Sequence, residues 1–163
     1  MSALVVARCF DAAVLASLHV ATVTVAYRSF FPGSPPPAID DIRAMWEARL
    51  SDPTAVAFAA LFDGRPVGSV MVRADPSFPE GQLVGLHVLP GEWGHGTGGL
   101  LHDYALGALL DAGFHTAGLW VLAANERARR MYERRGWVLR PGVETAPDGV
   151  LEVRYRRVVG PDP

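Results

Sequence analysis

The sequence contains little cysteine and no large excess of either charge, and both shortages restrict its function. Cys9 is the only cysteine in 163 residues, so the chain can form neither an internal disulfide nor a cysteine-rich zinc site. A reducing compartment fits this best, and we expect a cytoplasmic protein. The formal net charge of −2 and the pI of about 6.2 do not provide the strongly basic surface that nucleic acids or acidic membranes attract. We therefore expect no nucleic-acid partner.

Long apolar runs and recognisable metal-ligand motifs are also missing. The most apolar early segment, 12–26, is interrupted by His19, Thr22 and Thr24 and is shorter than the roughly 20 residues that a spanning helix needs. We expect no membrane partner. The five histidines follow no H-E-x-x-H or similar spacing, and no G-x-S-x-G motif indicates a serine hydrolase. We expect no metal site.

What is present is the composition of a chain with a buried core. Hydrophobic residues make up 50% of the sequence and charged residues 20%, as in ordinary globular proteins. The length suits one domain and is too short for two of full size. We expect a single domain over residues 1–163.

The order of patterns along the chain predicts an α/β (α+β) fold. Strands are predicted at 4–8, 56–62, 67–73, 82–89, 119–122, 137–140 and 150–159, and helices at 12–26, 42–50, 100–110 and 125–135. The β-branched residues of 20–25 leave a strand open for the first helix. Asp63-Gly64 predicts a tight hairpin turn. Antiparallel strands followed by alternating strands and helices indicate a mixed sheet with helices on both faces.

A glycine-rich segment, Trp-Gly-His-Gly-Thr-Gly-Gly at 93–99, lies between a predicted strand and a predicted helix. Free N–H groups and the helix dipole at such a position favour a bound anion, and glycine lets a phosphate approach the main chain. A turn that only packs a helix on a sheet has the same pattern. The segment alone leaves both interpretations open.

Two phosphate-bearing ligands compete for this segment. Residues 94–99 satisfy the G-x-G-x-x-G pattern of dinucleotide-binding oxidoreductases. In that fold, however, the glycines directly follow the strand and an acidic residue ends the next strand about 20 residues later. Here residues 90–93 intervene, and the next strand ends with no acid before Glu126. The other candidate is the pyrophosphate of coenzyme A.

A second group of residues follows the strand at 119–122. Asn125 and Tyr132 are seven residues apart, which is two helical turns, and Ala128 lies between them on the same face. A slim ligand fits along such a face. Taken singly, Asn125 is typical of a helix cap and Tyr132 of a half-buried aromatic residue.

Together these motifs closely resemble the GNAT superfamily of acyl-CoA-dependent N-acetyltransferases. The shared pattern runs from Gln82 to Trp137: a strand, Pro90, W-G-H-G-T-G, a long helix, L-W-V-L and N-x-x-A-x-x-x-Y-x-x-x-G-W. The resemblance implies a GNAT-like mixed, mostly antiparallel sheet of six or seven strands. It also implies a V-shaped splay between the fourth and fifth strands with acetyl-CoA in that cleft, and it allows a homodimer.

The same resemblance implies a set of coenzyme-binding residues. Backbone groups of Leu86, His87 and Val88 would contact the pantetheine arm, with the Val88 N–H as oxyanion donor. Asn125 would also hold the coenzyme, and Arg129 is a candidate for its 3′-phosphate. The N–H groups that would bind the pyrophosphate belong to Gly94, His95, Gly96, Thr97, Gly98 and Gly99.

Acetyl transfer from a thioester to an amine needs a proton donor for the leaving thiolate and a base for the amine. A phenol with a pKa near 10 stays protonated at neutral pH and can donate to a thiolate whose conjugate acid has a pKa of about 8.5, so Tyr132 is the candidate acid. The base is less clear, because Gln82 stands where many family members place a glutamate.

His87 and Glu80 are the candidate bases, and either would act through water. Strand alternation assigns Gln82 and His87 to opposite faces of the strand, so His87 would not simply replace Gln82. His87 can equally be a hydrogen-bonded histidine that fills the sheet. A third alternative is that no side-chain base exists and the free amine reacts.

The resemblance leaves the acceptor open. In the family it is shaped by segments that correspond to 27–38 and 142–149, and a small-molecule amine or a peptide N-terminus both remain candidates. A noncatalytic acyl-CoA sensor is the alternative to an enzyme, and Gln82 would then mark lost chemistry.

Overall fold

The computed structural model describes residues 2–160, apart from the side chain of Asp148. The strands are β1 (Leu4–Arg8), β2 (Val56–Phe62), β3 (Arg65–Ala74), β4 (Gly81–Val88), β5 (Thr116–Leu122), β6 (Val138–Thr145) and β7 (Glu152–Val158). The helices are α1 (Ala12–Ala26), α2 (Ile39–Leu50), α3 (Thr97–Asp111) and α4 (Glu126–Arg134). Two 3-10 turns, η1 (Pro90–Glu92) and η2 (Pro147–Gly149), complete the described elements.

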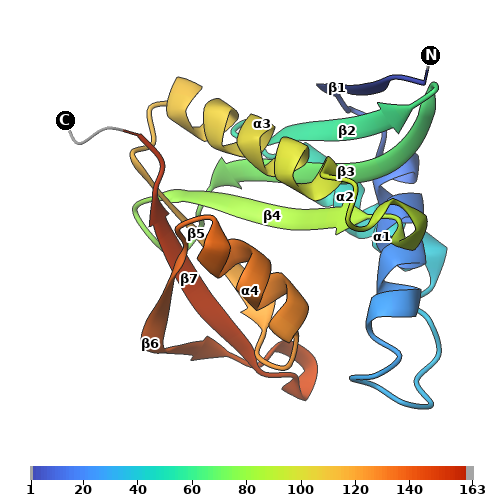
Figure 1. The fold of residues 1–163 in the computed structure, drawn as a ribbon. Coiled ribbons are helices and arrows are strands. Elements are labelled where there is room, and N and C mark those ends of the chain that lie inside the picture. Colours follow the sequence, from blue (N-terminus) through green and yellow to red (C-terminus); the bar gives the residue numbers. More distant parts are fainter. Residues whose placement is uncertain (1, 161–163) are drawn as a thin grey trace.

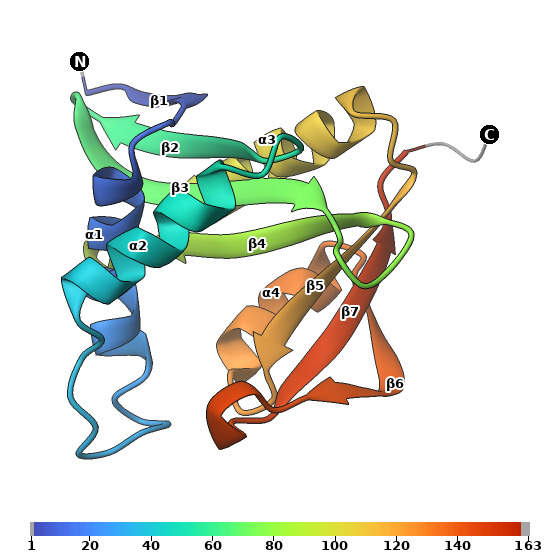
Figure 2. The same ribbon diagram turned by 180° about the vertical axis from the view of Figure 1, so that it is seen from behind.

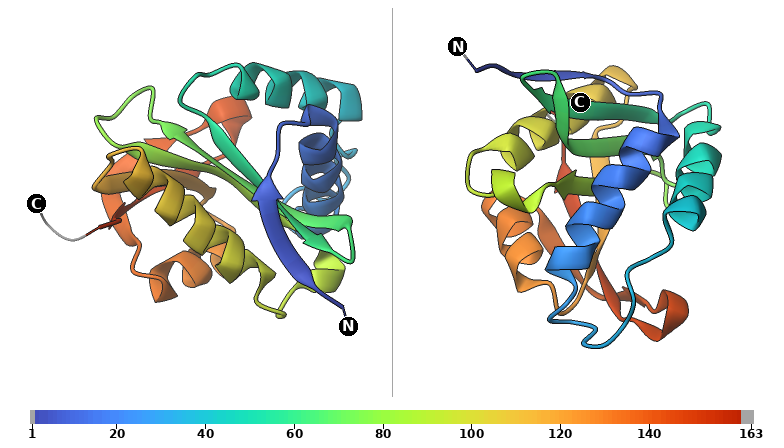
Figure 3. Two further views of the ribbon diagram at one scale, coloured as in Figure 1. Left: turned by 90° about the horizontal axis from the view of Figure 1, so that it is seen from above. Right: turned by 90° about the vertical axis from the view of Figure 1, so that its right-hand side faces the viewer.

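The strands form one mixed sheet with helices on both faces, as predicted (Figure 1). The strand order is β1-β2-β3-β4-β5-β7-β6, and every neighbouring pair except β4 and β5 is antiparallel. Helices α1 and α2 lie on one face, where Trp46 and Leu15 form a small core with β2 and β3 (Figure 2). Helices α3 and α4 pack on the other face around a larger core that includes Leu101, Tyr132 and Trp137. Views from above and from the side separate the two layers (Figure 3).

The sheet opens into a V between its fourth and fifth strands. Only two residue pairs join β4 and β5 in parallel, Gly81 with Ala117 and Gln82 with Gly118. Beyond these pairs the strands diverge, and β4 has no strand beside it on that edge from Leu83 onward. The splay predicted between the fourth and fifth strands is therefore confirmed.

A bulge in β4 changes which residues share a face. Ser69 pairs with His87 and Met71 pairs with Val84, so two residues of β4, Gly85 and Leu86, lie opposite one residue of β3. Gly85 has φ of +61°, and the extra residue reverses the alternation. Val84 and His87 therefore both face α2.

The prediction that Gln82 and His87 lie on opposite faces is wrong, because it assumed an unbroken alternation. Gln82 bonds Arg73 on the face that carries α2, and the His87 ring contacts Trp46 of that helix. The same reversal directs Leu86 toward the core beneath α3, the side on which Leu83 also lies.

The residues that predicted the start of the first helix and the first hairpin turn have these roles in the structure. Asp11 caps α1, and its Oδ1 accepts from the N–H groups of Ala13 at 2.8 Å and Val14 at 3.4 Å. Segment 20–25 is helical, which resolves the open alternative for the first helix. Asp63 and Gly64 both have positive φ and turn β2 into β3. Helix α3 begins at Thr97, earlier than predicted, because the glycines after Gly96 already have helical backbone.

Candidate functional site

The segment before α3 presents its main chain to an open space. Gly94 and Gly96 have φ of +82° and +87°, which side chains rarely adopt, and a Cβ at either position would contact nothing within 4 Å. Within residues 2–160, no acceptor bonds the N–H groups of Gly96, Thr97, Gly98 or Gly99. The N-terminus of a helix with free N–H groups attracts an anion.

These groups line a cleft of about 580 Å³ between the two arms of the V. Its wall consists of the end of α1, the second half of β4, the glycine segment and one face of α4. The lining residues include Thr22, Val25, Ala26, Leu86, Val88, Trp93, Gly94, Gly96, Thr97, Gly98, Gly99, Asn125, Arg127, Ala128, Met131 and Arg134. Asn125, Ala128 and the free N–H groups therefore share one cavity. His95 is exposed and does not line it.

The arginines of α4 divide into two groups. Arg127 and Arg134 line the cleft, and the Arg127 guanidinium carbon lies 3.9 Å from the centroid of the Trp93 ring. Arg129 points elsewhere: its Nε donates to the Tyr155 hydroxyl at 3.0 Å and its Nη1 to the Ala123 carbonyl at 2.9 Å. We therefore withdraw Arg129 as a phosphate ligand, since its donors hold α4 to β7 and to the end of β5.

The open edge of β4 offers backbone groups to the cleft. The Leu89 N–H bonds the Val67 carbonyl of the neighbouring chain segment at 2.8 Å, so the Val88 N–H, one residue earlier, points the opposite way. The Val88 carbonyl points to the same side as the Val88 N–H. It accepts hydrogen bonds from Trp93 Nε1 at 2.8 Å and from Thr22 Oγ1 at 3.3 Å. By the same alternation, the His87 backbone faces β3.

Tyr132 lies on the inner face of α4, next to the cleft. Its ring packs edge-on against Trp137 at 5.9 Å, and the residue is 7% exposed. It lines a second, smaller cavity of about 150 Å³, which shares Thr22, Leu86 and Asn125 with the cleft. Burial, and then the nearby Tyr27, raise the pKa of the Tyr132 phenol, so it stays protonated over the whole neutral range.

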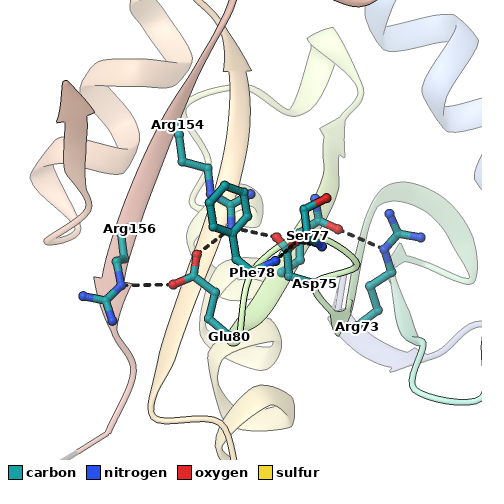
Figure 4. A network of polar contacts seen from close by, with 8 residues as sticks. Arg73, Asp75, Ser77, Phe78, Glu80, Arg154 and Arg156 are labelled. Carbon is teal, nitrogen blue, oxygen red and sulfur yellow. Dashed lines mark hydrogen bonds and ion pairs between the residues drawn. The ribbon is translucent and has the colours of Figure 1, made fainter. Parts of the chain in front are cut away.

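Glu80 is held in a buried ion cluster (Figure 4). Its Oε1 bonds Arg154 Nη2 at 2.6 Å and its Oε2 bonds Arg156 Nε at 3.0 Å, while Asp75 Oδ2 bonds the same Arg154 nitrogen at 2.6 Å. Arg154 is 1% exposed, and its guanidinium lies over the ring of Phe78 at 4.3 Å. Both oxygens of Glu80 are thus occupied, which disfavours it as a base.

His87 is packed among aromatic rings. It stacks on His19 with centroids 4.3 Å apart and meets Trp46 edge-on at 6.2 Å. Burial, followed by the charges of His19 and Arg49, lowers the pKa of His87 well below its ordinary value. His19 has a pKa lowered to about 4, mainly by burial, and its Nδ1 accepts from Trp46 Nε1 at 3.2 Å. Both rings are neutral at pH 7, and such low pKa values make them weak bases.

Glu152 is a functional candidate that sequence reasoning missed. It lines the cavity of Tyr132 and His87 from the start of β7, opposite Leu122 of β5. Burial raises the pKa of its carboxyl and the charge of Arg49 partly offsets this. No motif surrounds Glu152, and the only sequence signal is its alternation with the core residues Val153 and Tyr155.

Two other kinds of feature are absent from the part of the chain that the structure describes. There, no three His, Cys, Asp or Glu side chains gather in a way that could hold a metal ion. None of the described helices has both the length and the apolar character needed to cross a bilayer.

The chain is similar to known acetyltransferases in both sequence and fold. The acetyltransferase (GNAT) family model matches residues 20–137, which include the end of α1, the glycine segment and the whole of α4, and the chain belongs to this family. Uncharacterized N-acetyltransferases of Mycobacterium bovis and Mycobacterium tuberculosis are 33% identical over 119 residues, covering 66% of this chain and 75% of theirs.

Solved structures share the fold at lower identity. PaiA N-acetyltransferase from Thermoplasma acidophilum, crystallised in complex with coenzyme A, matches with a TM-score of 0.76 and 14% identity over 96% of this chain and 99% of that one. An acetyltransferase from Thermus thermophilus matches with a TM-score of 0.70 and 22% identity over 95% of this chain and 96% of its own.

Proposed function

We propose that this protein transfers an acetyl group from acetyl-CoA to a primary amine of a small molecule. The observation that carries the proposal is that two cavities adjoin. The cleft with free N–H groups at one end shares Thr22, Leu86 and Asn125 with the smaller cavity of about 150 Å³ that Tyr132 lines, which we call the chamber. A coenzyme bound by its pyrophosphate at α3 would then direct its thioester toward that phenol.

The residues of the cleft fit coenzyme A by charge and shape. The N–H groups of Gly96 to Gly99 would bind the pyrophosphate, and the missing side chains at Gly94 and Gly96 leave room for it. Arg127 and Arg134, in place of Arg129, would face the remaining phosphate. The free edge of β4 at Leu86 and Val88 would bond the amide groups of the pantetheine arm.

The proton transfers can then be assigned to two side chains. The ammonium of the acceptor first gives one proton to Glu152, and the free amine nitrogen then attacks the thioester carbonyl to form the C–N bond. The Val88 N–H stabilises the oxyanion. The C–S bond breaks and Tyr132 gives its proton to the leaving sulfur, while the second proton of the new amide nitrogen passes to the Tyr132 phenolate. The products are the N-acetyl amine and coenzyme A with a free thiol, and Glu152 releases its proton to solvent.

The test is thiol release from acetyl-CoA with a panel of amines, comparing wild type and Tyr132→Phe. We expect kcat to fall by roughly 10²–10⁴, the usual contribution of a general acid, with little change in the dissociation constant for acetyl-CoA. Tyr104→Phe is the matched control, because Tyr104 of α3 is 43% exposed, packs against Phe58 of β2 and lines neither of the two cavities. An unchanged turnover number in Tyr132→Phe would remove that residue from the role of acid.

The same assay separates the two alternative functions. Coenzyme A binding by calorimetry without turnover of any amine would indicate an acyl-CoA sensor. Thermal stabilisation by NAD and none by coenzyme A would indicate a dinucleotide-binding protein instead, and would refute the proposal.

A further inference from the structure

A third cavity adjoins the chamber of Tyr132, away from the coenzyme cleft. This cavity, of about 480 Å³, lies between α1, α2 and the connection that joins them. Its lining residues are His19, Val23, Thr24, Tyr27, Arg28, Phe31, Ser34, Pro35, Pro36, Pro37 and Ile42, and it shares Val23 and Tyr27 with the chamber. An acceptor would reach the thioester through these two spaces, whose size suits a small molecule.

Arginine side chains dominate the charge around this route. Arg49, at the end of α2, lies over the ring of Trp46 at 4.9 Å, and Trp46 in turn packs against His19 and His87. Arg73 of β3 lies on the same face of the sheet, where its Nε donates to Gln82 at 2.9 Å.

Arg28 lines the outer cavity, which adds a third cation to the route. The one carboxylate that lines the inner chamber is Glu152, counting only residues whose side chains the structure describes.

The Arg49 guanidinium is half-buried and forms no ion pair; burial and then the charge of Arg73 lower its pKa, and the more distant Glu152 only partly offsets this. Among residues 2–160 no described carboxylate lies within 4.0 Å of it, and no hydrogen bond joins it to another side chain. Asp52, a nearby acid, turns its Oδ1 to the N–H and hydroxyl of Thr54 instead. A cation that has left water without a partner is costly, so it either binds an anion or is retained for one.

We infer that Arg49 binds a carboxylate of the acceptor while Glu152 receives the proton of its amine, so that the acceptor is a small amine that also carries a carboxylate, such as an amino acid. The inference rests on the proposed acetyl transfer and narrows its substrate. Glu152 lines the chamber, and Arg49 lies over Trp46, which packs against the His19 and His87 rings beside it, so a zwitterion carries the two charges that complement this pair. A polyamine or another polycation would bring several positive charges past Arg28, Arg49 and Arg73, and electrostatic repulsion disfavours it.

Paired acceptors test the inference. Each amino acid of a panel is assayed beside its own C-terminal amide, which keeps the amine and the side chain and lacks the carboxylate. Spermidine serves as the polycation. With wild type we expect kcat/KM for the acids to exceed that for the amides by about 10–100-fold, the range of a charge-assisted hydrogen bond. Arg49→Met should raise KM for the acids by the same factor and leave KM for the amides and for acetyl-CoA unchanged.

Arg43→Met is the control for Arg49, because Arg43 lies on the same helix and forms exposed ion pairs with Asp40 and Glu47. Equal or better turnover of amides or spermidine would overturn the inference and leave acetyl transfer intact. So would an Arg49→Met variant that weakens acids and amides alike. Coenzyme binding without thiol release for any amine would instead refute the proposed function, and this inference with it.

Glu152→Gln tests the other end of the chamber. We expect kcat to fall by about 10²-fold at pH 7, and the deficit to shrink as the pH rises toward the pKa of the amine, because the free amine then needs no base. A merely structural role would give a deficit that does not depend on pH, and that result would contradict the assignment. Glu144→Gln, at an exposed position of β6, is the control.

Discussion

The stacked pair of His19 and His87 should make the protein sensitive to mild acid. The unfolded chain binds a proton at His19 below about pH 6.5, whereas the folded chain binds it only near pH 4, because burial opposes the charged ring. Between these values the unfolded state holds more protons, so stability falls as the pH falls. A shift from 6.5 to about 4 corresponds to about 2 kcal/mol of unfolding free energy lost from pH 7 to pH 5 through His19 alone.

His19→Asn isolates this contribution. The Asn Oδ1 stands close to the position of Nδ1 and keeps an acceptor for Trp46 Nε1, but it does not titrate. We expect the loss of stability between pH 7 and pH 5 to be about 2 kcal/mol smaller in the variant, measured by urea unfolding with tryptophan fluorescence. His95→Asn, at an exposed position, should behave as wild type.

The remaining sensitivity of the variant would come from His87, whose pKa is also lowered by burial. Equal losses in wild type and His19→Asn would refute the reasoning, since they would mean that the His19 ring is solvated or charged in the folded protein.

Two further predictions concern the cleft and the buried ion cluster. Gly98→Asp places a carboxylate beside the free N–H groups without backbone strain, so it should weaken coenzyme A binding at least about 100-fold, measured by calorimetry. Gly107→Asp, on the same helix, should leave binding unchanged. Normal affinity of Gly98→Asp would contradict the assignment of the cleft. Arg154→Met leaves the buried Asp75 without its ion pair and leaves Glu80 with Arg156 alone, so it should lower the unfolding free energy by about 3–5 kcal/mol, while exposed Arg140→Met should have little effect. A loss below about 1 kcal/mol would mean that the cluster contributes little.

The residues that we propose for the coenzyme stand out in the sequence because their signals are local. A glycine with positive φ, a helix start without a side-chain cap and a small residue between Asn125 and Tyr132 are all features of neighbouring residues. Asn125 does cap α4, through Oδ1 to the Ala128 N–H at 3.2 Å, and it lines the cleft as well. The two interpretations of Asn125 that the sequence left open are therefore compatible.

The residues that we propose for the acceptor carry no such signal, because they come near one another only in the folded chain. Arg49 and Glu152 are about a hundred positions apart and belong to no motif. The prediction from side-chain alternation along β4 failed at Gly85, where one extra residue changes the face to which the following side chains point. A glycine inside a strand pattern is a known sign of a bulge, so this signal was present. The sequence could not show that Glu80 is unavailable as a base, because its partners, Arg154 and Arg156, lie more than seventy positions away in the last strand.

The ion cluster stands beside the last residue pair that joins the two arms of the sheet. A Cβ at Gly118 would collide with Arg154 Nη2 and Glu80 Oε1, so these groups crowd the point where pairing stops. Their ion pairs join the residues just before β4 to β7, the final strand. The point from which the two arms diverge is therefore tied together at the opposite end of β4 from the glycine segment.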